Sequence, residues 1–289
     1  MKSIKENGLF GKYFKPSILE TESKARTGIA MRTNPNFSQK SAFLLIVSLI
    51  AALYLACSSP EEITIFMLGD STMADKPIPE ADPERGWGQV LQQFFKDGVT
   101  VRNHAVNGRS TKSFLDEGRW QVVLDALQPG DYVFIQFGHN DQKVKDPARY
   151  TNPYTGYRRN LIRYVRETRE KGATPILFSS IVRRKFNEFG VLEDTHGAYP
   201  LVMRLVAQEH DVAFIDLQLE SEILVTSLGP EKSKALYLWI EPGKYKNFPN
   251  GNQDNTHFNE HGATEMAELA IEEIRRQKLP LAKLIRTER

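Results

Sequence analysis

Four short polar blocks hold the residues that could do chemistry in this 289-residue chain. They read Gly69-Asp70-Ser71-Thr72, Asn107-Gly108-Arg109-Ser110, Gly138-His139-Asn140-Asp141 and Asp254-Asn255-Thr256-His257. A serine attacks an ester only with a base that takes its proton and a third group that orients the base. His257 can be the base for Ser71, and Asp254, three residues before the histidine, can bond its other ring nitrogen. The blocks therefore predict a serine nucleophile served by a histidine–aspartate pair.

The negative charge that develops on the attacked carbonyl oxygen needs several hydrogen-bond donors. The backbone N–H groups of Ser71 and Gly108 and the side-chain amide of Asn140 are the candidates. Glycine suits its position because it allows a close backbone approach and a positive φ at little cost. The G-x-S-x-G elbow of α/β-hydrolases is absent, since Met73 stands in place of its second glycine. An ordinary α/β-hydrolase is therefore disfavoured.

Apolar runs in the sequence predict the elements that position these blocks. The runs that predict strands are 63–68, 99–104, 132–137, 175–179 and 212–215. The segments between them that have helical spacing of apolar residues are 87–95, 161–168 and 201–206. A last helix is predicted from Gly262 to Arg276, with Asn259 as its N-cap. Strands that alternate with helices predict an α/β fold in which helices cover a central parallel sheet of about five strands. Ligands bind beyond the carboxyl ends of such strands, which is where polar blocks stand.

Charge and composition exclude several classes of protein. Residues 57–289 hold 30 Lys and Arg against 33 Asp and Glu, so a general electrostatic attraction to nucleic acid is not expected. Cys57 is the only cysteine, which excludes a disulfide framework and a cluster of zinc thiolates. His257 and His261 have the spacing of helical metal ligands, but no third ligand is evident and the predicted helix begins between them. No metal site is therefore predicted.

Residues 1–56 are predicted to be a leader, and residues 57–289 a single domain. The run 42–56 has fifteen residues without a charge, which matches a signal-peptide core and is short for a spanning helix. Residues 53–57 resemble a bacterial lipoprotein signal, which implies that Cys57 is lipidated; a cleaved signal and an uncleaved anchor are the alternatives. Each places the body outside the cytoplasm, either in the periplasm or at the cell surface as a lipoprotein, or secreted. Met31 begins a complete signal by itself, so we hypothesise that translation starts there.

As a set, the four blocks resemble the GDSL or SGNH hydrolase family over about residues 62–276. More particularly, with Gly86-Trp87-Gly88 and Ser113-Phe114, they resemble rhamnogalacturonan acetylesterases. The resemblance implies a three-layer flavodoxin-like sandwich and the removal of acetyl groups from pectin backbones without a cofactor.

The resemblance also implies a role for each matching residue. Ser71 would be the nucleophile, His257 the base and Asp254 the residue that orients it. Ser71, Gly108 and Asn140 would form the oxyanion hole. The expected partner is an acetylated polysaccharide or oligosaccharide, with the membrane reached only through the leader.

Two further places are candidates for substrate binding. Arg183-Arg184-Lys185 follow the fourth predicted strand directly, where a basic cluster could bind galacturonate carboxylates; a solvated charged loop is the alternative. Trp239 stands in a polar region near two tyrosines and is a candidate for stacking on a sugar ring.

Other functions fit the same blocks. Acetylxylan esterases, lipases and thioesterases are the alternatives among enzymes, and a non-catalytic glycan-binding surface protein is the alternative from another class. The segments 74–85 and 183–197 are polar and charged, whereas a lipase would present a broad apolar surface. A sugar substrate is therefore favoured.

Overall fold

The structure of the chain is a computed structural model that describes residues 62–77 and 82–287. The predicted leader, the hypothesised start at Met31 and the lipidation of Cys57 lie outside these residues. Among the helices in the described ranges, none combines the length and the apolar character that crossing a membrane requires.

The central sheet has five parallel strands, as the sequence predicts. The strands are β1 (Ile63–Leu68), β3 (Val99–Asn103), β4 (Tyr132–Gln136), β5 (Thr174–Phe178) and β6 (Ala213–Ile215). Their order across the sheet is β3-β1-β4-β5-β6. This is the order of flavodoxin-like folds, in which the chain reverses its direction of travel across the sheet between β1 and β4. The expected fold class is therefore confirmed.

Alternate residues of each strand point to opposite faces of the sheet, and both faces are covered by helices. One face packs against α6 (Leu217–Lys232) and α7 (Glu260–Arg276). The strand residues on this face are Ile65, Met67, Phe134, Ile176, Phe178 and Ile215. The other face packs against α3 (Arg119–Ala126), α4 (Arg158–Glu170) and α5 (Tyr199–Glu209). The strand residues on that face are Phe66, Leu68, Val133, Ile135 and Leu177. Because both faces are buried, the strand sequences are almost continuously apolar.

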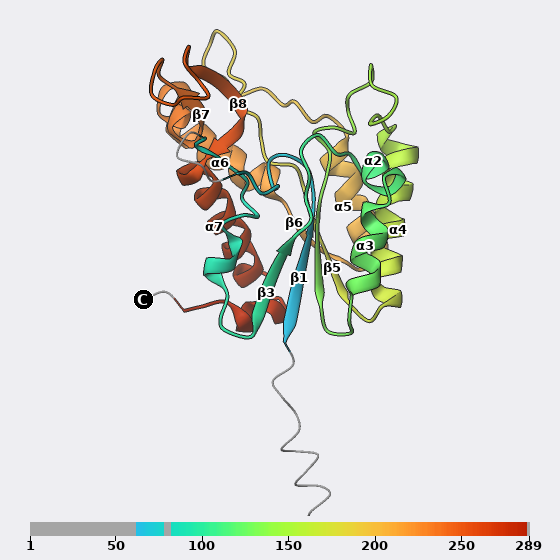
Figure 1. Cartoon of the computed structure of the whole chain (residues 1–289). Coiled ribbons are helices and arrows are strands. Elements are labelled where there is room, and N and C mark those ends of the chain that lie inside the picture. Colours follow the sequence, from blue (N-terminus) through green and yellow to red (C-terminus); the bar gives the residue numbers. More distant parts are fainter. Residues whose placement is uncertain (1–61, 78–81, 288–289) are drawn as a thin grey trace, which may run out of the picture. The chain divides into compact units, whose positions relative to one another are not determined.

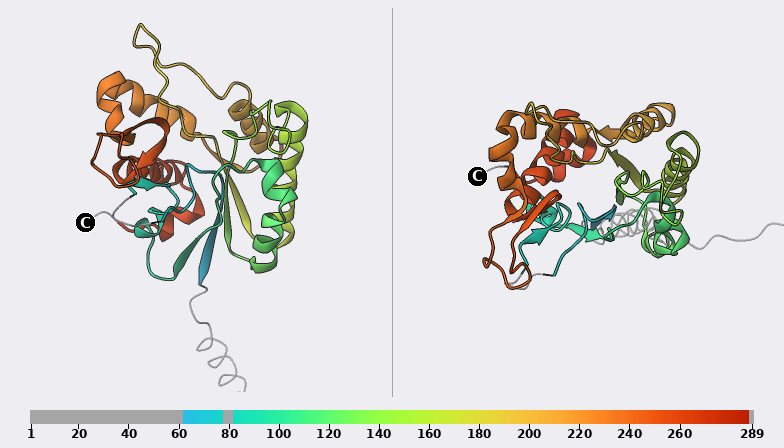
Figure 2. Two further views of the ribbon diagram at one scale, coloured as in Figure 1. Left: turned by 45° about the horizontal axis from the view of Figure 1, so that its top comes forward. Right: turned by 90° about the horizontal axis from the view of Figure 1, so that it is seen from above.

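The helices form two layers, which Figures 1 and 2 show on either side of the sheet. The layer coloured green to yellow contains α2 (Thr111–Asp116), α3 (Arg119–Ala126), the π-helical turn η2 (Pro153–Tyr157), α4 (Arg158–Glu170) and α5 (Tyr199–Glu209). The layer coloured orange to red contains α6 (Leu217–Lys232), η3 (Ser233–Leu236), α7 (Glu260–Arg276) and η4 (Pro280–Leu284). The side chain of Asn259 accepts a hydrogen bond from Gly262 N at 2.9 Å, so the predicted N-cap of α7 is confirmed.

A second, antiparallel sheet was not predicted. It consists of β2 (Glu84–Arg85), β8 (Asn252–Asn259) and β7 (Tyr237–Ile240), in the order β2-β8-β7. Trp239 therefore lies on a strand rather than in a polar loop. Sequence patterns miss this sheet because β2 has only two residues and β8 is polar along nearly its whole length.

The prediction of a helix at 87–95 is wrong. The chain there makes successive turns and the short 3-10 helix η1 (Leu91–Phe94). A Cβ at Gly86 would lie 2.2 Å from the carbonyl oxygen of Ala74, and the backbone N–H of Trp87 donates to Thr72 O at 3.0 Å, so this segment packs directly on the backbone that follows Ser71. Turns that repeat every three residues still bring Trp87 and Leu91 into the core, which explains the misleading pattern.

The face assigned to the helix at 201–206 is partly wrong. Leu201 and Leu205 are 53% and 41% exposed, whereas Val202, Met203 and Val206 are buried on α5. The helix carries apolar residues on more than one side, so spacing alone did not identify the side that packs.

Candidate active site

Ser71 lies on a turn that follows β1 directly, at the edge of the sheet that faces upward in Figure 1. We call residues 69–72 the nucleophile turn. Asp70 and Thr72 are buried while Ser71 is half-buried. A Cβ at Gly69 would lie 2.7 Å from Sδ of Met73, so the turn is packed tightly against the core. The serine is thus the one side chain of this turn that reaches the surface.

Buried hydrogen bonds hold the nucleophile turn in place. Asp70 Oδ1 accepts from the backbone N–H of Thr72 at 3.0 Å and from its hydroxyl at 2.9 Å. Gln136, at the end of β4, accepts from Trp87 Nε1 at 2.9 Å and from the Thr72 hydroxyl at 3.3 Å. The Gln136 amide also donates to Ser179 O after β5 at 3.2 Å. The turn is therefore tied to three neighbouring strands, and Asp70 acts as its brace.

Asp254 and His257 lie in a wide bulge of β8. Tyr237 of β7 pairs with Phe258 of β8, and Trp239 pairs with Gln253. Two steps along β7 therefore correspond to five steps along β8. The extra residues form what we call the acid–base loop, residues 254–257. Such bulges re-aim side chains at the end of a sheet. Asp254 Oδ1 closes this one by accepting from the backbone N–H of His257 at 3.0 Å.

The structure brings Ser71, His257 and Asp254 into one hydrogen-bonded chain. His257 Nε2 lies 2.8 Å from Ser71 Oγ, and His257 Nδ1 lies 2.7 Å from Asp254 Oδ2. Serine and histidine are 186 residues apart in sequence. With Nδ1–H donated to the carboxylate, the Nε2 lone pair faces the serine hydroxyl. This geometry is the one a serine nucleophile and its base require.

The aspartate shifts the titration of the histidine. Burial by itself would lower the pKa of His257, but the hydrogen bond and charge of Asp254 outweigh it and raise that pKa above its usual value. Burial disfavours the Asp254 carboxylate, yet the hydrogen bonds from His257 hold the pKa of Asp254 below its usual range. Asp254 is therefore ionised at neutral pH and stabilises the imidazolium that forms when His257 takes a proton.

Two of the expected oxyanion donors, Gly108 and Asn140, lie on segments that a hydrogen bond joins. Gly108 has φ of +75°, the left-handed conformation that favours glycine. Among the hydrogen bonds of residues 62–77 and 82–287, none uses the backbone N–H of Ser71 or of Gly108. Asn140 Nδ2 donates to Arg109 O at 3.1 Å, which directs the amide to the segment that carries Gly108. The three donors thus remain candidates for one oxyanion site.

Asp141 anchors the block that carries Asn140. Its carboxylate accepts from the backbone N–H of Thr111 at 3.1 Å and from the hydroxyls of Thr111 and Thr151 at 2.5 and 2.7 Å. Burial raises the pKa of Asp141 to about 7 despite these hydrogen bonds. Spacing gave no sign of this role, because both threonines belong to other segments.

Arg183, Arg184 and Lys185 do not act as one cluster. Arg184 is only 7% exposed and donates to Asn255 Oδ1 at 2.7 Å, to Ser233 Oγ at 3.0 Å and to Pro230 O. Lys185 pairs with Glu193 at 2.8 Å on an exposed loop. Only Arg183 is directed towards the strand ends, where it donates to His139 O at 3.3 Å. The side chains of these consecutive residues point in different directions because the segment is irregular and each side chain contacts a different distant partner.

Arg184 holds the acid–base loop from behind. Its backbone N–H donates to Asn255 O at 2.9 Å, in addition to the side-chain bond to the same residue. Trp239 Nε1 also donates to Asn255 Oδ1, at 2.9 Å, and the Arg184 guanidinium lies 5.0 Å from the Trp239 ring centre. We call these contacts of Arg184 and Trp239 the clamp. Both residues, expected to bind substrate, thus contact the loop that carries Asp254 and His257.

Trp239 also borders open space beside the β7–β8 hairpin. It lines a cavity of about 620 Å³ together with polar residues of β8, and Lys234 Nζ lies 4.5 Å from its ring centre. A sugar contact at Trp239 therefore stays a prediction.

One pair of charged residues near His257 was missed in the sequence. Lys76 Nζ lies 2.8 Å from Glu84 Oε1 and 2.5 Å from Asn107 Oδ1. The charge of Glu84 raises the pKa of His257, after the larger effect of Asp254, and that of Lys76 lowers it. Only the tertiary structure reveals this pair, because β2 brings Glu84 beside β8.

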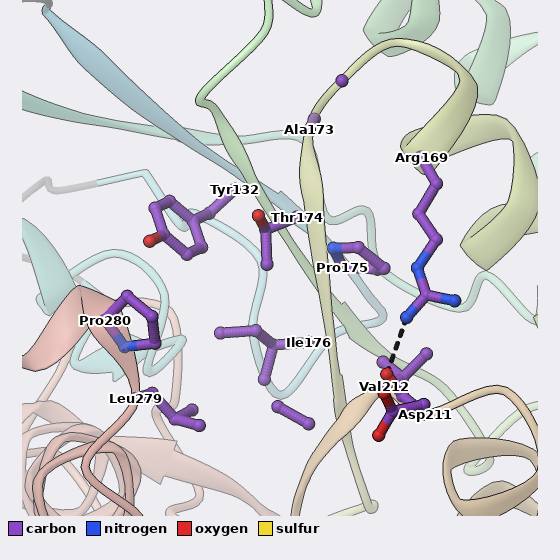
Figure 3. A pocket seen from close by; sticks show the side chains of 12 residues that line it. Tyr132, Arg169, Ala173, Thr174, Pro175, Ile176, Asp211, Val212, Leu279 and Pro280 are labelled. Atoms are coloured by element: carbon purple, nitrogen blue, oxygen red, sulfur yellow. Dashed lines mark hydrogen bonds between the residues drawn. The ribbon is translucent and has the colours of Figure 1, made fainter.

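Another cavity lies away from these residues. It measures about 390 Å³ and is lined by the amino ends of β4, β5 and β6 and by Leu279 and Pro280 (Figure 3). Its Arg169 is engaged with the backbone, donating to His210 O at 2.7 Å and to Asp211 O at 2.6 Å. The residues that could attack an ester are at the opposite ends of the strands.

The described residues contain no group of three or more His, Cys, Asp and Glu side chains that could hold a metal ion. His257 lies on β8 and His261 on α7. His261 Nδ1 lies 3.8 Å from Glu265 Oε1 on its own helix.

The chain is similar to known proteins over most of its length. Residues 67–264 match the model of the GDSL-like lipase/acylhydrolase family. Rhamnogalacturonan acetylesterase RhgT of Bacillus subtilis is 48% identical over 219 residues, which cover 76% of this chain and 92% of that protein. The probable rhamnogalacturonan acetylesterase YesY of the same organism is 38% identical over 78% of this chain and 98% of its own length. The crystal structure of Bacillus subtilis YxiM superposes with a TM-score of 0.64 at 28% identity, covering 76% of this chain and 58% of that one.

Proposed function

The chain belongs to the GDSL-like lipase/acylhydrolase family, and we propose that it removes O-acetyl groups from the plant cell-wall polysaccharide rhamnogalacturonan. Membership in this family makes it a carboxylic ester hydrolase. The similarity to two proteins named as rhamnogalacturonan acetylesterases supports the choice of substrate. The family model, which matches residues 67–264, spans the nucleophile turn and the acid–base loop alike.

The observation that carries the proposal is the hydrogen-bonded chain from Ser71 Oγ through His257 to Asp254, at 2.8 and 2.7 Å. In the proposed first step, Ser71 Oγ attacks the acetyl carbonyl carbon while its proton moves to His257 Nε2. Asp254 stabilises the imidazolium, and the donors of Ser71, Gly108 and Asn140 stabilise the oxyanion. His257 then gives the proton to the sugar oxygen, which leaves as a hydroxyl and leaves an acetyl-enzyme.

The second step reverses these roles with water. His257 takes a proton from a water molecule, whose oxygen attacks the acetyl-enzyme carbonyl. When the second tetrahedral intermediate collapses, the proton returns to Ser71 Oγ and acetic acid is released, which ionises to acetate in solution. The acetyl ester and one water molecule balance the two steps.

The proposal includes the location of the enzyme. The apolar run 42–56 followed by Cys57 supports an extracytoplasmic protein, either anchored as a lipoprotein in the periplasm or at the cell surface, or secreted. Labelling with a radioactive fatty acid in cells, with Cys57→Ser as the comparison, tests the anchor. Incorporation into both proteins or into neither would contradict it.

The substrate is tested by measuring acetate released from a matched panel of acetylated rhamnogalacturonan, homogalacturonan and xylan, with a long-chain ester as the lipase substrate. Rhamnogalacturonan should give the highest kcat/KM. Ser71→Ala serves as the control, and it should release no acetate above background. Faster release from xylan would instead favour an acetylxylan esterase, and equal rates for wild type and Ser71→Ala would favour a non-catalytic glycan-binding protein.

A further inference from the structure

Three cations border the proposed oxyanion donors, and we propose that Lys143, Arg149 and Arg183 form a cationic rim that binds a carboxylate of the polysaccharide. The ligand would be a uronic acid residue of the chain that carries the acetyl ester. This inference rests on the proposed function insofar as the substrate is an acidic polysaccharide.

Arg149 lies against the glycine of the oxyanion site. A Cβ at Gly108 would lie 3.3 Å from Nη1 of Arg149, so the guanidinium occupies the space beside this residue. Its Nε pairs with Asp146, three residues earlier on the same loop. The Arg149 side chain is 35% exposed, so its terminal nitrogens can meet a ligand at the surface.

Arg183 and Lys143 flank the asparagine of the same site. Arg183 Nη2 donates to the carbonyl of His139 at 3.3 Å, one residue before Asn140, and Nη1 donates to Thr195 Oγ1 at 3.1 Å. The backbone N–H of Lys143 donates to Asn140 O at 3.2 Å, so one turn carries both residues. Burial, and then the positive charges of Arg149 and Arg183, lower the pKa of Lys143, which agrees with three cations close together.

Two members of the rim, Lys143 and Arg183, differ from other cations nearby because they have no ion-pair partner among residues 62–77 and 82–287. Lys76 pairs with Glu84 at 2.8 Å, and Arg109 pairs with Glu117 at 3.0 Å. In the described part of the chain, no carboxylate lies within ion-pair distance of Lys143 or of Arg183. Asp70 acts on both, and Asp146 on Lys143, only as more distant charges. Among the described residues, Asp146 is thus the one carboxylate paired with the rim, through Arg149.

The three cations of the rim have one paired carboxylate in the described ranges, so they repel one another, and a bound anion relieves that repulsion. Guanidinium groups bind carboxylates with paired, charge-assisted hydrogen bonds. A uronate carboxylate beside the acetylated sugar would fit here, because the rim lies next to the groups proposed to hold the acetyl oxygen. The rim would therefore select an acidic polysaccharide over a neutral one.

Inhibition by a ligand without acetyl groups tests the rim separately from the reaction. Hydrolysis of p-nitrophenyl acetate is measured in the presence of trigalacturonate, and then of its methyl ester, which has the same sugars but no charge. The variants are Lys143→Gln and Arg149→Gln. Lys145→Gln, on the same exposed loop, is the matched control.

The acid should inhibit more strongly than the methyl ester. Lys143→Gln and Arg149→Gln should each raise the inhibition constant of the acid about 3- to 10-fold. This is less than the loss of a buried charge-assisted hydrogen bond would cause, because solvent partly screens the contact. Lys145→Gln should leave it unchanged, and added salt should narrow the difference between acid and ester. Equal inhibition by acid and ester, no inhibition by either, or equal effects of Lys143→Gln and Lys145→Gln would overturn the rim. Selective inhibition by the acid without acetate release from any pectin would uphold the rim and overturn the proposed substrate.

Discussion

The nucleophile turn and the acid–base loop contribute to one site but are held by different kinds of contact. The nucleophile turn follows a central strand, and its Asp70 and Thr72 are buried between strand ends. The residues of the acid–base loop are half-buried on a small antiparallel sheet. The turn is therefore part of the core, whereas the loop is fastened to the molecule by a few polar contacts.

This difference indicates which parts of the site are rigid and which are adjustable. Moving Ser71 would disturb the packing of Gly69 against Met73 and the bonds to Gln136. Moving His257 would disturb mainly its bonds to Asp254 and the clamp on Asn255. Damage to the turn should thus cost stability first, and damage to the loop should cost activity first.

The largest effect is expected from Asp254→Asn. An amide NH₂ facing Nδ1 would favour the imidazole tautomer whose Nε2 carries the proton, so His257 could no longer accept from Ser71. We expect kcat to fall by about 10³- to 10⁴-fold with little change in melting temperature. Steady-state kinetics with p-nitrophenyl acetate and thermal unfolding measure the two quantities. A variant that keeps a tenth of wild-type kcat would remove Asp254 from the proposed mechanism.

Asn140→Ala should have the next largest effect. It removes one side-chain donor while leaving the hydrogen bond from Ser71 to His257 in place. Loss of one oxyanion donor lowers kcat by about 10²- to 10³-fold. KM should change much less, because the ground-state carbonyl carries little charge. If kcat stays within a factor of three of wild type, Asn140 serves only to fasten the segment of Arg109.

Arg184→Met removes the Arg184 contacts of the clamp and so tests the acid–base loop, the adjustable part of the site. We expect kcat/KM to fall by about 10- to 100-fold, which corresponds to about 1.5–3 kcal/mol for a lost charge-assisted hydrogen bond. A looser His257–Asp254 contact would also lower the pKa of His257, so the acidic limb of the pH–rate profile should move to lower pH. Arg184→Lys should recover part of the rate. A loss of melting temperature with an unmoved acidic limb would mean that Arg184 only stabilises the fold.

Gln136→Leu makes the corresponding change at the nucleophile turn, the rigid part of the site. It leaves the indole N–H of Trp87 without its buried acceptor and Ser179 O without this donor, at a cost of about 1–3 kcal/mol, while the Thr72 hydroxyl keeps Asp70 Oδ1. The melting temperature should fall by about 2–4 °C for each kcal/mol in a domain of this size. The acidic limb should stay where it is. Should the limb move as far as in Arg184→Met, the contrast between the two halves would be lost.

The smallest effect is expected from Glu84→Gln, through charge alone. Activity requires a neutral His257, so the rate should fall as pH drops through the raised pKa of this residue. Burial opposes that raised pKa, and Asp254 supports it more than Glu84 does. Removing the Glu84 charge should lower the pKa, and the acidic limb should move to lower pH while the plateau rate is nearly kept. An unchanged pH–rate profile would show that Glu84 is screened from His257.

The apolar runs and polar blocks of the sequence are enough to predict the parallel sheet and the residue types of the site. Strands that are buried on both faces consist of continuous apolar runs, so their positions can be predicted from the local sequence. The polar blocks after those runs could be recognised because parallel strands end at one edge. The positions of Ser71, Asp254 and His257 can be predicted from this pattern without their contacts.

Contacts between distant segments determine which way neighbouring side chains point and what holds them in place. Arg183 and Arg184 are adjacent, yet one faces the strand ends and the other binds Asn255, which lies 71 residues away. The bulge of β8 depends on its register with β7, and the first turn at 87–95 is held by a hydrogen bond from the backbone N–H of Trp87 to Thr72 O at 3.0 Å. These features arise from contacts between distant segments, and such contacts leave no periodic pattern in the sequence.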